Sequence, residues 1–271
     1  MVVAPDILGH MNNPPSVTWN PNVKLICADV DQTVADDFMP AEPEMIHELN
    51  AILSEGIRLF FVTGGPLTRL RTRVIDQLNP QLRQHVLVSH CSGAEVWGFN
   101  ADGGQHEEPF YSVYDSHMTE EQKTTWRQVV DELVAEFKLK KYPPQPVEQF
   151  RGAVGDDPLS IIYEDRGPQI TLEVINGYDM TESQHQAALA QLPNLEEVVD
   201  LREPMLTWIA NRLKRQGVPV TPRLAGVFAL DLALEGVSKT QSVERVLASE
   251  AIMGHLGLSS AVVLTYSLQS H

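Results

Sequence analysis

Two aspartates directly follow a short apolar run near the beginning of the chain. The run is "LICA" at 25–28, and Asp29 and Asp31 come next. If the run is a buried β-strand, residues two apart share a face, so both carboxylates can approach one small volume at its carboxyl end. Crowded carboxylates resist ionising together, so one can act as a nucleophile and the other as an acid, or a cation can neutralise both. Asp36 and Asp37, a few residues later, are expected to be solvated turn residues.

The elements that must position these aspartates are strands and helices in alternation. Apolar runs that predict buried strands lie at 23–29, 57–63 and 85–90. Apolar residues at helical spacing predict helices at 42–56 and 66–78. This alternation is typical of a mostly parallel sheet covered by helices, and ligands of such sheets bind at the carboxyl ends of the strands. The basic residues Arg69, Arg71 and Arg73 of the second helix are expected to form a solvated face.

The sequence changes character after residue 100. Features that predict a second, inserted domain are a Gly-rich turn at 101–109, an amphipathic helix through Trp126 and Phe137, a Pro-rich connector at 141–150, two β-rich runs around Gly167 and Pro168, and helices at 181–192 and near 205–217. The run at 225–236 is expected to return to the first sheet. We therefore predict an N-terminal arm at 1–20, a core at 21–100, an inserted domain at 101–224 and a second part of the core at 225–271.

Composition excludes several classes of partner. The formal net charge is -16, which argues against a nucleic acid or an anionic membrane as partner, because both require clustered Lys and Arg. The two cysteines and nine histidines show no disulfide framework and no zinc-ligand spacing. No apolar run is long enough for a membrane span, and the first twenty residues lack the pattern of a signal peptide. These observations predict a reduced, cytoplasmic protein, and they leave its oligomeric state open.

Three motifs in sequence resemble those of the haloacid dehalogenase superfamily of phosphohydrolases. The first is "DVDQTV" with Asp29 and Asp31, the second is "FFVTGG" with Thr63, and the third is Lys239 in "LEGVSKTQSVERVL". The segment "LVSHCSGAEVWGF" is similar to the one that precedes the large type C2 cap of Cof-like, sucrose-phosphate and phosphomannomutase enzymes. The match covers roughly residues 21 to 264. It implies a Rossmann-like α/β core with a parallel sheet and an inserted α/β cap domain.

The resemblance also implies roles for the first two residues. Asp29 would attack phosphorus and form an aspartyl-phosphate, while Asp31 would protonate the leaving alcohol and later activate water. Asp29 through its carboxylate and Asp31 through its carbonyl oxygen would hold Mg²⁺, the expected cofactor.

The second and third motifs would bind the phosphate group. Thr63, Gly64 and Gly65 would hold its oxygens through a hydroxyl and backbone N–H groups at the start of a helix. An ordinary helix N-cap at Thr63 uses the same geometry and remains an alternative. Lys239 would screen the charge on the phosphoryl group and the nucleophile, and a surface lysine is the alternative. Ser238 and Gln241 have the spacing of a capping box that begins the following helix.

Two cap residues complete the expected site. Arg166 and Gln169 lie near a β-turn in "YEDRGPQITLE", which loosely resembles the substrate-facing segment of sugar-phosphate caps.

The fourth motif of the family, which supplies further carboxylates for magnesium, does not appear. After the apolar run at 261–264, the positions where those carboxylates would fall hold hydroxyl side chains, namely Thr265, Tyr266, Ser267 and Ser270. These are poor magnesium ligands at neutral pH. The segment "VGDDPLS" at 154–160 imitates the motif but precedes Lys239, so we interpret it as a turn. Either the chain is a truncated or altered version of a longer hydrolase, or its metal site is degenerate.

The resemblance therefore implies magnesium-dependent hydrolysis of a small phosphorylated metabolite, with a sugar phosphate as the expected class. The alternatives are a phosphosugar mutase and a silent phosphate-binding protein of the same fold.

Overall fold

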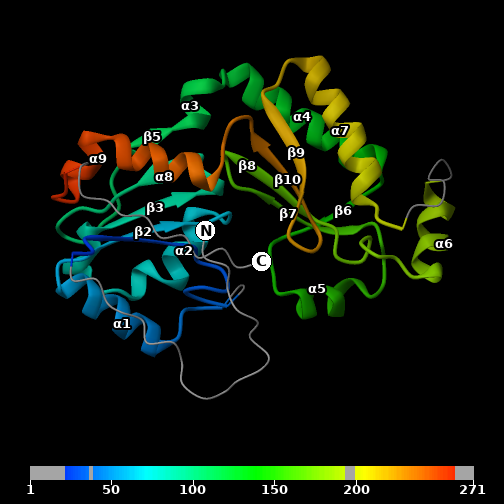
Figure 1. Cartoon of the computed structure of the whole chain (residues 1–271). Helices are drawn as coiled ribbons and strands as arrows, with labels where there is room; N and C mark the ends of the chain where they lie inside the picture. Colours follow the sequence, from blue (N-terminus) through cyan, green and yellow to red (C-terminus); the bar gives the residue numbers. More distant parts are fainter. Residues whose placement is uncertain (1–21, 37–38, 193–198, 260–271) are drawn as a thin grey trace, which may run out of the picture.

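The computed structural model describes residues 22–36, 39–192 and 199–259. The chain forms two lobes, each built around its own sheet (Figure 1). The first sheet contains, in spatial order, β1 (Leu25–Ala28), β2 (Arg58–Val62), β3 (Val86–His90), β4 (Glu95–Trp97) and β5 (Tyr111–Ser112). The second sheet contains β6 (Lys140–Tyr142), β7 (Ser160–Asp165), β8 (Gln169–Glu173), β10 (Ala229–Leu234) and β9 (Val220–Ala225).

Helices flank both sheets. Those of the first lobe are α1 (Pro43–Ser54), α2 (Leu67–Arg73), α8 (Lys239–Ala248) and α9 (Glu250–His255). Those of the second lobe are α3 (Val113–His117), α4 (Glu120–Glu136), α5 (Val147–Val154), α6 (Glu182–Gln191) and α7 (Arg202–Gln216). Short 3-10 helices span Ile75–Gln77, Pro80–His85 and Cys91–Gly93. No helix in these described ranges has the length and hydrophobicity that a membrane span needs.

The first sheet is buried on both faces at its centre. Strands β1, β2 and β3 are parallel, and β4 and β5 extend the sheet in antiparallel order. Along β2, Leu59 and Phe61 belong to the core formed with α1 and α2, whereas Phe60 and Val62 belong to the core formed with α8 and α9. A strand covered on both faces needs apolar residues at every position, which explains the continuous run "LFFV".

The second sheet has one apolar and one polar face. In β8, Ile170 and Leu172 are fully buried in a core with residues of α4 and α7, while Gln169, Thr171 and Glu173 alternate with them. Because side chains alternate along a strand, these polar residues lie on the opposite face of the sheet. Paired positions extend this face across four strands as a polar row, which consists of Glu164, Thr171, Asp231 and Arg223.

Most predicted elements are confirmed. The predicted strands correspond to β1, β2 and β3, and the runs around Gly167 form the β7–β8 hairpin. The α/β fold class with a parallel core is also confirmed. The helix predicted at 66–78 is shorter, because α2 ends at Arg73 and a 3-10 turn follows.

The prediction that 225–236 returns to the first sheet is wrong. Strand β10 pairs antiparallel with β8 and β9 in the second sheet. Its sequence "ALDLAL" alternates, with Leu230 and Leu232 in the core and Asp231 between them on the polar face. That pattern is typical of a sheet with one covered face, and the chain rejoins the first lobe only with α8. The expected arm at 1–20 and the segment 261–270 lie outside the described residues.

Candidate active site

Asp29 and Asp31 lie in a tight loop directly after β1. Between them, the buried Val30 uses its carbonyl oxygen to accept backbone hydrogen bonds, which come from Thr33, Val34 and Ala35. Gln32 adopts a left-handed φ of 57° to make this turn. The loop therefore fixes the backbone of both aspartates at the carboxyl end of β1.

Lys239 reaches Asp29 from the far end of the sequence. Its Nζ lies 2.6 Å from Asp29 Oδ2, and Asp29 Oδ1 accepts the backbone N–H of Val30 at 2.8 Å. Lys239 is the first residue of α8, and the N-cap Ser238 accepts the N–H of Gln241 at 3.2 Å. The Asp29 and Lys239 side chains are 40% and 43% exposed, so this ion pair is accessible to a ligand.

Gly93 allows the start of α8 to approach the first sheet. It has a φ of 109°, and a Cβ at this position would lie 2.6 Å from the carbonyl oxygen of Ser238 and 2.8 Å from Ser242 Cβ. A hydrogen bond of 2.7 Å between the buried hydroxyl groups of Ser89 and Ser242 also joins β3 to α8. The glycine of the "CSGA" segment thus sets the position of Lys239.

Thr63 follows β2 and lies beside Asp31. Its buried hydroxyl donates to Asp31 Oδ2 at 3.4 Å and accepts the N–H of Gly65 at 3.0 Å. The N-cap of α2 is Pro66, so the alternative that Thr63 caps this helix is wrong. The structure thus brings Asp29, Asp31, Thr63 and Lys239 to one edge of the first sheet.

Arg73 binds Asp31, which the sequence analysis missed. The Nη1 atom donates to Asp31 Oδ1 at 2.6 Å, while Nε and Nη2 donate to the carbonyl oxygens of Met39 and Asp36 at 2.7 and 2.6 Å. Its side chain is only 7% exposed, so the predicted solvated face is wrong for Arg73. The other buried residues of α2 are Leu67 and Leu70, and Arg73 follows them at the same spacing of three. Residues at this spacing share a helix face, so the sequence did indicate a buried position for Arg73.

The other two arginines of α2 differ from each other. Arg69 Nη2 lies 2.7 Å from Glu164 Oε2 of β7, so it links the two lobes. Arg71 is partly exposed: it pairs with Asp76 at 3.3 Å and donates from Nη1 to Gln105 Oε1 at 3.2 Å.

The predicted cap residues also face the first lobe, in different ways. Arg166 donates from Nη1 to the carbonyl oxygen of Gly64 at 3.0 Å, and its Nη2 lies 2.6 Å from Glu164 Oε2. Gln169 is fully buried and donates to the Thr171 hydroxyl at 3.2 Å. Its Oε1 atom has no hydrogen-bond partner within the described part of the chain. Arg166 therefore contacts the loop of the second motif directly, whereas Gln169 belongs to the polar face behind it.

The polar row makes a further contact between the two lobes, near the end of β3. Thr171 donates to Asp231 Oδ1 at 2.8 Å, and Arg223 Nη2 donates to the hydroxyl of Ser92 at 3.1 Å. Burial raises the pKa of Glu173, which lies on the same face of β8. The two lobes thus meet through charged and polar side chains above the carboxyl ends of β1 to β3.

Comparison with solved structures identifies the fold. The C-terminal domain of trehalose-6-phosphate phosphatase from C. albicans matches with a TM-score of 0.53 and 12% identity, over 84% of this chain and 63% of that domain. At this identity the likeness shows that the two proteins share an α/β fold.

Two further structures were found at lower scores than the C. albicans domain. A haloacid dehalogenase-like hydrolase from Bacteroides thetaiotaomicron has a TM-score of 0.49 at 14% identity, over 87% of this chain and 78% of that one. IMP-nucleotidase from Plasmodium falciparum has a TM-score of 0.49 at 11% identity, over 88% of this chain and 57% of that one. This chain spans less than two thirds of the Candida domain and of the Plasmodium enzyme. Neither the family models nor the curated proteins give a match to this sequence.

At this edge of the sheet, the carboxylate of Asp29 and the backbone carbonyl oxygen of Asp31 could hold a metal ion. Magnesium commonly binds one or two protein carboxylates together with waters and substrate phosphate, so this pair fits the ion. No group of three or more His, Cys, Asp or Glu side chains suited to a metal occurs in the ranges that the structure describes. Asp157, from the segment that imitates the fourth motif, instead accepts from Ser160 and pairs with Lys140 at 2.9 Å.

We predict that Arg73→Met destabilises the protein strongly, because it leaves Asp31 and two carbonyl oxygens without their donor. We expect a loss of about 2–4 kcal/mol in the free energy of unfolding, measured by urea denaturation. Arg71→Met on the same helix is the matched control, and it should change stability by about 0.5 kcal/mol or less. Equal effects of the two substitutions would contradict the assigned role of Arg73.

We also predict that Gly93→Ala displaces the start of α8. Positive φ and the contact with Ser238 together should cost about 2 kcal/mol or more of unfolding free energy. The control is Gly152→Ala in α5, where nothing lies within 4 Å of the added Cβ. That substitution should leave stability unchanged or slightly higher. If Gly93→Ala were as stable as Gly152→Ala, the packing of the start of α8 against residue 93 would not require a glycine there.

Proposed function

We propose that this chain hydrolyses small phosphate monoesters by transferring the phosphoryl group to Asp29. The observation that carries the proposal is the hydrogen-bonded group at the carboxyl edge of the first sheet, where Asp29 meets Lys239 and Asp31 meets Thr63. These residues come from three segments of the chain that are far apart in sequence. A nucleophile, an acid and two phosphate-binding groups within one small volume are the parts that phosphoryl transfer requires.

In the first step, a carboxylate oxygen of Asp29 attacks phosphorus, and the bond from phosphorus to the ester oxygen breaks. Asp31 gives its proton to the leaving alkoxide, so the alcohol departs neutral. Lys239 turns from Asp29 towards the phosphoryl oxygens and balances their charge. The Thr63 hydroxyl turns from Asp31 Oδ2 to donate to one of these oxygens, which frees Oδ2 for proton transfer.

In the second step, Asp31 takes a proton from water, and the resulting hydroxide attacks the aspartyl-phosphate. The bond between phosphorus and Asp29 breaks, which releases inorganic phosphate and restores the carboxylate. Arg73 holds one oxygen of Asp31 at 2.6 Å, so the other oxygen remains in place for both proton transfers. When magnesium is bound by Asp29 and Asp31, it would supply additional positive charge at the phosphoryl group.

The second lobe is proposed as the cap that selects the substrate. Arg166 lies beside Gly64, and the polar row continues from there across the sheet, so a bound ester would meet charged and hydrogen-bonding side chains. Hydroxyl-rich leaving groups such as sugars suit this wall better than apolar ones do. The name of the C. albicans neighbour, trehalose-6-phosphate phosphatase, agrees with a sugar phosphate as substrate.

A phosphate-binding protein without turnover is the second candidate. It is favoured by the cations that already pair with both carboxylates, Lys239 at 2.6 Å from Asp29 and Arg73 at 2.6 Å from Asp31. In the described residues no third acidic ligand joins them, so a metal ion must compete with these ion pairs.

We predict that Asp29→Asn abolishes hydrolysis of a generic phosphate monoester such as p-nitrophenyl phosphate. The loss should be about a thousandfold or more, because the amide is a poor nucleophile of nearly the same volume. Asp36→Asn is the matched control in the same loop, where the side chain is exposed, and it should retain activity. Wild-type turnover by a folded Asp29→Asn variant would exclude the mechanism. Wild-type protein that binds phosphate without any turnover would favour the second candidate.

We further predict that magnesium activates the chain only weakly. With the carbonyl oxygen of Asp31 and a single carboxylate, Asp29, which is already paired with Lys239, half-maximal activity should require magnesium at about millimolar concentration or above. A magnesium titration of the initial rate, with calcium as the comparison ion, measures this. Efficient turnover at micromolar magnesium would mean that another carboxylate completes the site.

A further inference from the structure

A second cavity lies at the opposite edge of the first sheet. It has a volume of about 380 Å³, and the residues that define its chemistry are Arg58, His85, His106 and His255. Arg58 begins β2 and His85 immediately precedes β3, so the cavity opens at the amino ends of these parallel strands. Asp29 follows the carboxyl end of β1, roughly 15 Å away along strands of this length. The cavity is therefore separate from the candidate active site.

The cavity gathers basic side chains in an acidic protein. No Asp or Glu is among the described residues that line it, although the chain carries a net charge of -16. Arg58 donates from Nε to the carbonyl oxygen of Leu256 at 2.7 Å and from Nη1 to that of Gly56 at 3.1 Å. Within the described ranges it has no carboxylate partner at ion-pair distance. A guanidinium held by carbonyl oxygens alone keeps its full charge available to a ligand.

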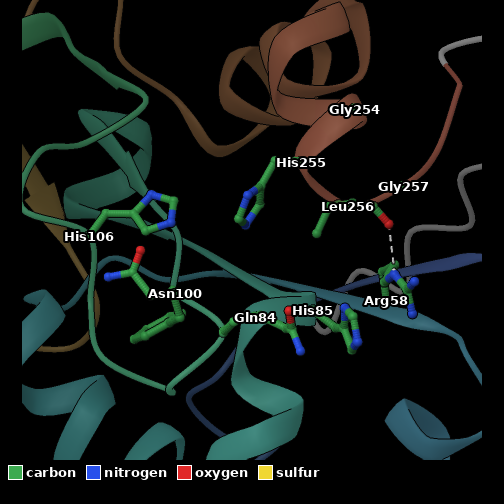
Figure 2. Close-up of a pocket in the computed structure, with 11 residues that line it drawn as sticks. Arg58, Gln84, His85, Asn100, His106, Gly254, His255, Leu256 and Gly257 are labelled. Carbon is green, nitrogen blue, oxygen red and sulfur yellow. Dashed lines mark hydrogen bonds between the residues drawn. The ribbon is translucent and has the colours of Figure 1, made fainter.

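The three histidines surround the same space (Figure 2). The rings of His106 and His255 lie 5.0 Å apart between centroids, and His255 Nε2 is buried with no hydrogen-bond partner in the described part of the chain. Burial, followed by the charges of His106 and His85, lowers the pKa of His255. Burial and then the charge of Arg58 lower the pKa of His85. Both shifts favour the neutral imidazole, and an anion bound beside these rings would oppose them by stabilising the protonated form.

The nature of the ligand follows from the arrangement of the donors. In Figure 2, His106 and His255 lie next to each other, and His85 lies beside Arg58. A carboxylate presents both of its oxygens on one side, whereas a tetrahedral oxyanion presents acceptors in opposite directions. The volume is at the lower end of the range for small-molecule sites. The histidines do not form a metal site by geometry, since no metal-binding group of three occurs in the described residues.

We propose that this cavity binds a phosphate group, either as inorganic phosphate or as the terminal group of a small phosphorylated metabolite. The guanidinium of Arg58 and the imidazole N–H groups donate to its oxygens. Since the bound anion stabilises protonated imidazoles, binding raises the pKa values of His85 and His255. The charged and titratable groups that face them are each other, His106 and Arg58.

The experiment is an NMR titration of the full chain with inorganic phosphate, in which the histidine side-chain signals are followed and assigned by substitution. We expect saturable shifts of the His85, His106 and His255 signals, and upward shifts of the His85 and His255 pKa values when the pH titration is repeated with phosphate. The exposed His117 of α3 should not respond. Methylphosphonate, which cannot be hydrolysed, replaces phosphate in a second titration. Binding of both probes indicates a terminal phosphate group as ligand, and binding of phosphate alone indicates the free ion.

Substitutions locate the binding. Arg58→Gln should weaken the affinity reported by these signals by about tenfold or more. Arg212→Gln removes the same charge from an exposed position of α7 and should leave the affinity unchanged. If Arg58→Gln fails to fold, His255→Gln tests the same site and should also weaken binding. The proposal is overturned if the three signals do not shift at millimolar phosphate, or if the folded pocket variants bind as tightly as the Arg212→Gln control.

Discussion

The buried guanidinium of Arg73 fixes the geometry on which the candidate active site depends. It joins the carboxylate of Asp31 to the carbonyl oxygens of Asp36 and Met39, so one side chain determines the path of the loop after β1. A buried charge is costly unless its donors are satisfied, and here each guanidinium nitrogen has an acceptor. The loop therefore cannot shift without exposing an unpaired charge, which holds Asp31 in one orientation beside Thr63.

The sequence alone was sufficient where a local pattern also determines tertiary position. Asp29 directly follows β1 and Thr63 directly follows β2, so parallel pairing brings these two to one edge, and Lys239 joins them from the start of α8. Arg73 was predicted to be solvated because of its charge, although its helical spacing from Leu67 and Leu70 indicates the buried face of α2. Strand β10 was assigned to the wrong sheet because its apolar content was weighed above its alternation. The link from Arg69 to Glu164 has no local signal, since it depends on how the two lobes meet.

Charge is distributed unevenly over the two edges of the first sheet. At the carboxyl edge, each aspartate has a cation within 2.6 Å, so the site is internally neutralised and a phosphate must displace or share these partners. At the amino edge, Arg58 and the histidines gather with no acid among the lining residues. An anion can enter the second site without breaking an ion pair. Phosphate binding must therefore disrupt an ion pair at the carboxyl edge but not at the amino edge, although both edges present a cation to a phosphate group.

The two cations of the candidate active site also differ in freedom, and this difference assigns their tasks in the proposed reaction. Lys239 is 43% exposed and holds one carboxylate oxygen, so it can move from Asp29 to a phosphoryl oxygen with a small change in solvation. Arg73 is 7% exposed and would leave two carbonyl oxygens unpaired if it moved. A group that must follow charge as it moves from nucleophile to phosphate has to be mobile, whereas a group that keeps an acid aligned through two proton transfers has to be fixed. Lys239 therefore suits the first task, and Arg73 is a positioning residue for Asp31.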